Sequence, residues 1–459
     1  MSKPLAISSV PLHRRPAPDG ESMERRRPAA RAAIGVVSAC VIAGALTQAC
    51  GGEVREPDAE VERGSQLTEL QRSEIAALEA LGYVHGDRPA GEETMVVLHD
   101  RTKALQGFNL YTAEHAWRAF LIDMDGRLLH FWEIPKIEGR KDKLKRVRLL
   151  ENGELLALLE RRAMYRLDRH SNVLWHFRGR VHHDFDVAHD GTIYVLIRRA
   201  GIYPSYDMDR PILNEAIRAI SPEGEVLETV WMLDAIQRSS CCSDFLDYAE
   251  AGDIFHTNAV HILDGSLEHR HPAFRAGNIL TSFRYVNAIA VVDMAAGRVV
   301  WGYRGPFVRQ HDPTVLDSGN ILLFDNEAPP HGLDGRSRVL ELDPFEDRIV
   351  WKFPPTPEIA FYSSTGATSE RLANGNTLIT ESRAGRVVEV THDMEVVWTF
   401  VNPARVPEDE NNIARIFEMQ RLPGDLALDW IPPHDYPEDA LSAFQTTIPD
   451  PERRDASSR

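Results

Sequence analysis

Cysteine is scarce in this chain, with four residues among 459. Cys40 and Cys50 fall in the N-terminal segment described below, and Cys241 and Cys242 are adjacent. Neighbouring cysteines do not fit ordinary disulfide geometry easily. In an oxidising compartment this pair could form a strained disulfide, pair between chains or stay free. We expect a structural or incidental role for it rather than a catalytic one.

Basic residues are also in short supply. The chain has 52 Lys and Arg against 69 Asp and Glu, which gives a formal net charge of −17. Nucleic acids select basic surfaces, so this balance argues against a nucleic-acid partner. It does not exclude a small anionic substrate, because the local charge in a channel can oppose the global sign.

The N-terminus has an apolar run, but the run is short. Ala32–Leu46 has about fifteen apolar and small residues, too few to span a bilayer comfortably. It follows the basic segment Arg25–Arg31, as in an export signal. The next stretch, from Leu46 to Cys50, resembles a bacterial lipoprotein box, in which the cysteine is lipidated. We therefore expect export to the periplasm, or a membrane-anchored lipoprotein with its lipid on Cys50. An uncleaved membrane anchor is the alternative.

No contiguous catalytic motif stands out, but the chain is repetitive. A turn, a short apolar strand and then a tryptophan recur six times, roughly 45–70 residues apart, near the period of a propeller blade. Each copy follows a β-branched strand and, in most copies, a strand opened by an Asn-Gly or Asp-Gly type of turn. The six tryptophans are Trp132, Trp175, Trp231, Trp301, Trp351 and Trp398. The pattern predicts an all-β fold, a six-bladed β-propeller. A β-sandwich or two smaller domains would be the alternatives.

The repeats and their flanks give the expected domain organisation. Residues 1–50 are the signal, 51–94 a linker with an amphipathic helix, 95–403 the propeller, and 404–459 a closing strand and a disordered tail. In the linker, a leucine and isoleucine stripe from Leu67 to Leu81 indicates the helix, with Thr68 as N-cap and Gly82 at its end. The expected blades span 95–135, 143–179, 181–234, 254–305, 307–354 and 361–403.

One register position in the repeats is unusually basic. Counting eight residues back from the glycine of each clear turn leads to equivalent positions in successive blades. These positions are Lys145, His183, His256, His311 and, in the sixth blade, Ala367. Inner strands of propellers crowd at the axis and usually carry small or apolar residues there. Three histidines and a lysine share this register. We therefore predict that they line a functional channel, and that the histidines are not simply hydrogen-bonded core residues.

Further polar residues lie near this register. Asn258 follows His256 by two and faces the same side of its strand. Arg284 lies on the next strand of the fourth blade, and Arg336 lies in the fifth. Histidine, lysine and arginine around one channel make an anion site for sulfate or phosphate oxygens. A neutral imidazole can also act as a nucleophile or as a general acid or base.

Four stretches together resemble one protein family. They are Asp253–Asn258, Ile279–Arg284, Gln310–Asp312 with Leu322–Asn326, and Arg371–Leu378. The combination is similar to the bacterial arylsulfotransferases of the arylsulfate sulfotransferase type, and the resemblance covers about residues 95–403.

The resemblance implies an exported six-bladed propeller that moves a sulfuryl group from a phenolic sulfate ester to a phenol. It implies no cofactor and no nucleotide donor of the kind that cytosolic sulfotransferases use. A histidine is transiently sulfated in a ping-pong cycle. By motif, His256 and His311 would be active-site members, and Arg284 and Arg336 are candidates for the family's arginine. The shared register, not the motif, adds His183 to the expected catalytic residues.

The chain departs from the family's pattern at two places. Tyr285 stands where a histidine is expected after Arg284, and the segment Phe361–Glu370, which contains Ala367, has no histidine. The family's sulfated histidine is expected late in the propeller, so this chain has no secure counterpart for it.

Two other functions fit the same residues. His183, His256 and His311 could be the ligands of a transition metal such as zinc in a hydrolase or lyase. A propeller can also bind a ligand without chemistry.

Cleavage of the signal can be tested directly. Intact-mass analysis of the membrane fraction should give a mature chain that begins at Cys50 and carries a lipid. A mature chain that still contains residues 23–49 would contradict cleavage.

Overall fold

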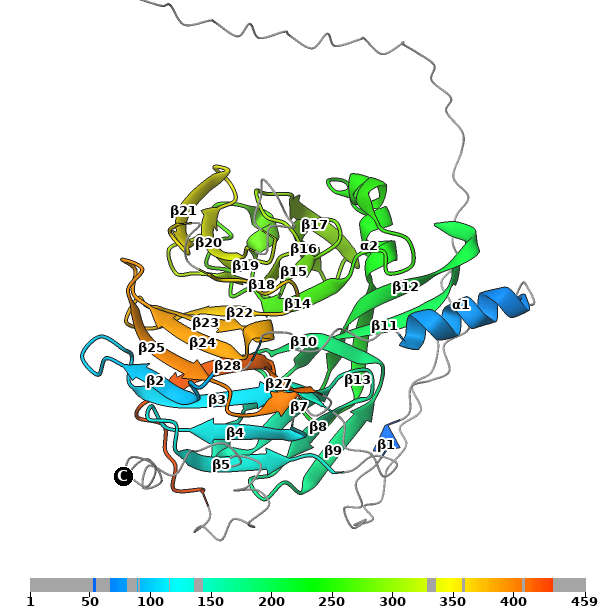
Figure 1. The fold of residues 1–459 in the computed structure, drawn as a ribbon. Coiled ribbons are helices and arrows are strands. Elements are labelled where there is room, and N and C mark those ends of the chain that lie inside the picture. The colour runs from blue at the N-terminus through cyan, green and yellow to red at the C-terminus, as the bar shows by residue number, and fades with distance from the viewer. Residues whose placement is uncertain are drawn as a thin grey trace, which may run out of the picture. The chain divides into compact units, whose positions relative to one another are not determined.

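The fold was analysed in a computed structural model that describes residues 53–54, 67–80, 89, 91–114, 116–135, 143–327, 336–356, 360–406 and 409–431. The expected signal, residues 1–50, and the expected disordered tail lie outside the described residues. The described chain folds into six antiparallel blades arranged in a ring (Figure 1). The predicted six-bladed β-propeller is therefore confirmed. None of the helices in the described ranges is long and apolar enough to cross a membrane.

Blades 2 to 4 each use consecutive strands. Blade 2 contains β6 (Leu144–Leu149), β7 (Leu155–Leu159), β8 (Ala163–Leu167) and β9 (Val173–Arg178), and β1 (Glu53–Val54) adds in parallel to β9. Blade 3 contains β10 (Val181–Val187), β11 (Ile193–Tyr203), β12 (Asp207–Ile220) and β13 (Val226–Trp231). Blade 4 contains β14 (Thr257–Ile262), β15 (Ile279–Phe283), β16 (Ala288–Asp293) and β17 (Arg298–Tyr303).

Blade 5 again uses consecutive strands, whereas blades 6 and 1 combine strands from both ends of the propeller. Blade 5 contains β18 (His311–Val315), β19 (Ile321–Asp325), β20 (Arg338–Asp343) and β21 (Arg348–Phe353). Blade 6 contains β22 (Thr368–Arg371), β23 (Thr377–Glu381), β24 (Arg386–Val390), β25 (Val396–Val401) and β2 (Met95–His99). Blade 1 contains β28 (Ile416–Pro423), β3 (Gly107–Ala113), β4 (Arg118–Ile122) and β5 (Leu128–Glu133). A hairpin, β26 (Arg405–Val406) and β27 (Asp409–Ile413), precedes β28.

Ring closure joins the two ends of the propeller in blade 1. The innermost strand of this blade is β28, which pairs with β3 over the length of both strands. Residues 95–99 are therefore not the inner strand of a first blade spanning 95–135, as the sequence pattern suggested. They form β2, which pairs antiparallel with the outer strand β25 of blade 6. The inner edge of β3 already pairs with β28, so residues 95–99 do not pair there. They instead pair with β25 and cover the otherwise open outer edge of blade 6.

The recurring tryptophans have a common structural role. All six lie on the outermost core strand of their blade, and four indoles donate a hydrogen bond to a turn carbonyl of the next blade. These bonds run from Trp132 to Gly153, from Trp175 to Pro222, from Trp351 to His392 and from Trp398 to Met124, at 2.8–3.0 Å. A buried indole needs such a partner. The repeat signature therefore records contacts between blades.

The expected linker helix is α1 (Glu69–Ala80). Thr68 caps it reciprocally with Gln71: the Gln71 N–H donates to Thr68 Oγ1 and the Thr68 N–H to Gln71 Oε1. The helix lies against the long β11–β12 hairpin (Figure 1). Glu79 fixes it there by accepting a hydrogen bond from the Ala200 N–H and pairing with Arg180.

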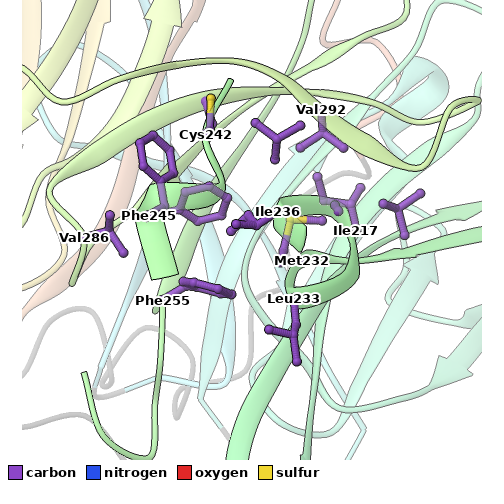
Figure 2. Packing of buried hydrophobic residues seen from close by; sticks show 14 of the residues in the cluster. Ile217, Met232, Leu233, Ile236, Cys242, Phe245, Phe255, Val286 and Val292 are labelled. Carbon is purple, nitrogen blue, oxygen red and sulfur yellow. The ribbon is translucent and has the colours of Figure 1, made fainter. Parts of the chain in front are cut away.

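A second helix, α2 (Met232–Gln237), fills the space between blades 3 and 4. It packs with Phe245 of a short 3-10 helix (Ser243–Tyr248) and with Val286 and Val292 of blade 4 (Figure 2). Cys242 is buried in this apolar cluster, whereas Cys241 is exposed, and both are free thiols. Burial raises the pKa of the Cys242 thiol, so it remains protonated and behaves as a core residue. Three further 3-10 turns are Glu151–Gly153, Pro272–Phe274 and Ser382–Ala384.

One buried guanidinium connects the inner strands at the axis. Arg146 of β6 pairs with Asp184 of β10 at 3.2 Å, with Asp312 of β18 at 3.1 Å, and with Glu418 of β28. The Asp184 carboxylate also accepts from the Val260 N–H of β14, and Asp312 from the Ser369 N–H of β22, both at 2.9 Å. All six inner strands therefore meet in one network.

Removing this guanidinium should destabilise the propeller strongly. Arg146→Met leaves three buried carboxylates without their cation, and we expect a loss of about 3–5 kcal/mol in the free energy of unfolding. Denaturant unfolding followed by tryptophan fluorescence measures it. The exposed Arg127→Met should change it by less than about 0.5 kcal/mol. Equal stabilities for the two variants would contradict the role given to Arg146.

Candidate active site

The inner strands are irregular at the register position that the repeats single out. Their pairing shifts at Leu144/Arg146, Val181/Phe185, Thr257/Val260 and His311/Thr314. His183, His256 and Ala367 have left-handed backbones, with φ of 56°, 53° and 83°. Such angles are uncommon outside glycine and mark bulges that redirect a side chain. His183 lies within a shifted part of its ladder, His256 and Ala367 lie just before their inner strands, and all three line the channel.

All five register positions line a single cavity of about 450 Å³. That volume suits a small aromatic ligand. Asn258 and Arg284 line it as well. Arg146 and Leu78 of α1 also lie among the lining residues. The other lining residues are Glu250, Ala251, Asp253, Tyr285, Arg309, Thr365, Gly366, Thr368, Ser382, Arg415 and Phe417.

His256 is held by a carboxylate. Its Nδ1 lies 2.7 Å from Asp253 Oδ2, which assigns the proton to Nδ1 and the lone pair to Nε2. The ring is 3% exposed and contacts the rings of His183 and Tyr285, each with centroids 4.8 Å away. Burial lowers the pKa of His256, although Asp253 opposes the shift. The imidazole is therefore neutral near pH 7.

His311 is held by an amide. Its Nδ1 donates to Asn326 Oδ1 at 2.6 Å, and the amide nitrogen of Asn326 donates in turn to the carbonyls of Ser363 and Gly366. These bonds fix the orientation of the amide and hence the tautomer of the ring. The Gly366 N–H points at His311 Nε2 from 3.3 Å. Burial, reinforced by Arg284, lowers the pKa of His311 well below its ordinary value.

His183 is held by a second imidazole. Its Nδ1 lies 2.7 Å from Nδ1 of His182, which is fully buried. The other nitrogen of His182 faces Glu215 Oε1 at 3.8 Å, and Glu215 Oε2 accepts from both the N–H and the hydroxyl of Thr257. Burial, with Lys145 nearby, lowers the pKa of His183 well below its ordinary value.

Cations surround the three neutral imidazoles. Lys145 pairs with Glu160 at 3.0 Å, and burial lowers its pKa to about 8. The Arg284 guanidinium lies over the Tyr285 ring at 5.1 Å, and Arg309 lies over the same ring at 5.4 Å. Both His256 and His311 feel the positive charges of Arg284 and Lys145. The cavity can therefore hold an anion beside imidazoles that are not themselves charged.

The structure separates one predicted site residue from the others. Arg336 is exposed, immediately before β20, and is not among the residues lining the cavity. Sequence reasoning missed Asp253, although it stands in the stretch quoted for the family resemblance, because its pairing with His256 depends on a turn. It also missed Arg415 and Phe417, which come from the segment predicted to close the ring. Within the described ranges, no three His, Cys, Asp or Glu side chains are placed to hold a metal ion.

Comparison with known proteins settles the family. The arylsulfotransferase (ASST) family model matches residues 146–403, more than half of the chain. The chain belongs to the arylsulfotransferase family. The resemblance seen in the sequence is thus confirmed. No match to a curated protein sequence was found.

Distant propellers of known structure are similar to this arylsulfotransferase-family chain. A protein of unknown function from Bacteroides caccae is 13% identical, covers 68% of this chain and 98% of its own, and has a TM-score of 0.47. A catalytically inactive virginiamycin B lyase from Staphylococcus aureus, with quinupristin, is 10% identical over 67% and 88% of the chains, with a TM-score of 0.38. These likenesses are too remote to bear on function.

The lysine should make anion binding depend on pH. Above about pH 8 the buried Lys145 loses its proton, so the affinity for inorganic sulfate should fall about tenfold between about pH 7 and about pH 9.5. Isothermal titration calorimetry measures it. Lys145→Met should remove this dependence, whereas Lys143→Met, on a half-exposed lysine paired with Glu114, should keep it. Equal wild-type affinity at both pH values would contradict the assignment.

Proposed function

We propose that this protein is an aryl sulfotransferase that moves a sulfuryl group between phenolic sulfate esters and phenols inside the propeller cavity. The donor is the sulfate ester itself, without a nucleotide, and no metal or other cofactor takes part. Membership of the arylsulfotransferase family supports the class of reaction. The partners are thus a phenolic sulfate ester and a phenol.

The observation that carries the proposal is the combination of neutral imidazoles with cations in one cavity. An imidazole attacks sulfur only through an unprotonated nitrogen, and burial keeps His183, His256 and His311 in that state. The three non-bridging oxygens of the sulfate ester carry its negative charge, and further negative charge develops on the bridging oxygen as the phenolate leaves. Lys145 and Arg284 lie in the same cavity and can stabilise that charge.

Two aromatic side chains in the cavity can contact the aryl ring of the substrate. Tyr285 and Phe417 both line the cavity, and an aryl ring can pack against them. Tyr285 is itself positioned by Arg284 and Arg309 over its ring. Asn258 also lines the cavity, and its amide nitrogen donates to the Gln310 carbonyl at 2.9 Å, which fixes the side chain in the wall. We further propose that the enzyme works after export, in the periplasm or as a lipoprotein anchored at Cys50.

Transfer can be measured with p-nitrophenyl sulfate as donor and phenol as acceptor. We expect release of p-nitrophenol and formation of phenyl sulfate, and turnover that a chelator does not reduce. His256→Ala and His311→Ala should each lower kcat/KM by about 100-fold or more. The exposed His269→Ala should leave it unchanged.

The neutral state of the three histidines also determines how kcat changes at acidic pH. Because folding lowers their pKa values, kcat should stay level through about pH 6.5 and fall only below it. Absence of turnover with p-nitrophenyl sulfate and with other aryl sulfates would reject the proposal. Ligand stabilisation in a thermal-shift screen without turnover would instead favour a binding propeller.

A further inference from the structure

A second hollow, which we call the outer groove, lies between α1, the tip of the β11–β12 hairpin and the segment 249–252. It measures about 450 Å³, as much as the cavity itself. Leu78, Glu250 and Ala251 line both hollows, so the outer groove adjoins the cavity. Sulfuryl transfer to a single-ring phenol needs only the cavity, which leaves the outer groove without a role.

The outer groove depends on a long hairpin in blade 3. The strands β11 and β12 have 11 and 14 residues, whereas β15 and β16, the equivalent pair in blade 4, have 5 and 6. Gln71 of α1 holds the tip of this hairpin by donating to the Asp209 carbonyl at 2.9 Å. Gln237 of α2 donates to the Ser205 carbonyl at 3.0 Å. Because the tip is fixed from both helices, the wall that it forms is in place before a ligand binds.

Leu78 lies where the two hollows meet. Gly252 faces it so closely that a Cβ atom on Gly252 would lie 3.1 Å from Leu78 Cδ2. Gly252 also has a φ of 82°, which favours glycine, and its carbonyl accepts the Leu213 N–H at 2.7 Å. Next to Leu78, the Glu79 carboxylate accepts the Ala200 N–H at 2.8 Å. The junction therefore has a fixed shape and contains an apolar side chain.

Much of the outer groove is apolar. Ala77 and Leu78 come from α1, Pro211 and Ile212 come from β12, and Tyr206 adds an aromatic ring. Such a lining suits an aromatic ring, because the ring leaves water without losing hydrogen bonds. The cavity, with its lysine and arginines, instead suits an anion.

The charges of the two hollows differ. The described residues that line the cavity include one lysine and four arginines against two carboxylates. Those that line the outer groove include three carboxylates, Glu74, Asp207 and Glu250, against one guanidinium, Arg210. Arg210 pairs with Asp207 at 3.0 Å, and Glu250 lies 3.6 Å from Arg309 of the cavity. The outer groove therefore disfavours an anionic group and accepts a neutral one.

We propose that the outer groove binds the second ring of an extended phenolic substrate whose sulfate ester or hydroxyl lies in the cavity. The inference rests on the proposed sulfotransferase function. The preferred substrates are then phenols that carry a neutral second ring on a short linker. Single-ring phenols leave the outer groove empty, and an anionic second ring meets its carboxylates.

Acceptor selectivity gives the first test, with p-nitrophenyl sulfate as donor. The acceptors are phenol, 4-benzyloxyphenol and a 4-benzyloxyphenol that carries a carboxylate on its second ring. We expect kcat/KM to be about tenfold higher for 4-benzyloxyphenol than for phenol, because the second ring adds buried apolar contact. The carboxylate should cancel most of this gain. Equal kcat/KM values for phenol and 4-benzyloxyphenol would overturn the inference.

Two adjacent alanines of α1 test whether the gain comes from the outer groove. Ala77 lines it, whereas the exposed Ala76 does not. Ala77→Trp fills the outer groove and should lower the ratio of kcat/KM for 4-benzyloxyphenol to that for phenol about tenfold. Ala76→Trp should keep the wild-type ratio. Circular dichroism checks folding, and Ala77→Phe gives a second measurement with a smaller ring. A wild-type ratio in both Ala77 variants would overturn the inference.

Charge reversal tests the acidic lining. Glu74→Lys should raise kcat/KM for the carboxylate-bearing acceptor about fivefold, because a repulsive charge is replaced by an attractive one. Glu69→Lys makes the same change in net charge in the exposed first turn of α1, outside the outer groove, and should have no such effect. Equal responses of the two variants would overturn the preference for a neutral second ring.

Calorimetry separates this inference from the proposed function. 4-Benzyloxyphenol should bind the full wild-type protein about tenfold more tightly than phenol, and Ala77→Trp should remove the difference, with or without turnover. Binding with this pattern but no transfer from any aryl sulfate rejects the sulfotransferase and supports the outer groove as a ring-binding site. Transfer to phenol without this pattern keeps the sulfotransferase and overturns the inference.

Discussion

A single guanidinium on the propeller axis determines how the rest of the molecule is arranged. Arg146 binds carboxylates from three other inner strands, and two of these carboxylates accept backbone N–H groups from the remaining two. Buried charges are tolerated only when they are paired, so no inner strand can move without leaving an unpaired group. Because Arg146 also lines the cavity, the same network holds the inner strands that carry the cavity's histidines.

The site arises where the repeats stop being alike. Equivalent register positions present lysine, histidine, histidine, histidine and alanine, so symmetry places five side chains around the cavity while substitution makes them chemically different. The groups behind the imidazoles differ further: a carboxylate, an amide and a second imidazole. A repeat fold thus supplies positions, and departures from the repeat supply chemistry.

The sequence was sufficient for the fold and for most of the cavity. Tryptophans at blade spacing predicted six blades, because each indole sits on an equivalent outer strand, and the eight-residue offset led to residues that line one cavity. Their catalytic roles stay predictions. The partner of His256 was not predictable, since Asp253 reaches it through a turn whose geometry no periodicity records. Arg336 was misjudged as a neighbour of the channel because membership of a blade does not tell inner from outer edge. The placement of β2 likewise depended on which strand closes the ring.

Closure by β28 also sets the order in which the cavity can be completed. The segment that brings Arg415 and Phe417 to the cavity, and Glu418 to Arg146, follows the strands of all the other blades in the chain. While the chain is being synthesised, the pocket lacks a wall and Arg146 lacks one of its carboxylates. A chain that stops short of this strand would contain all three histidines yet lack one wall of the cavity, so the final segment is the last part of the candidate site to be assembled.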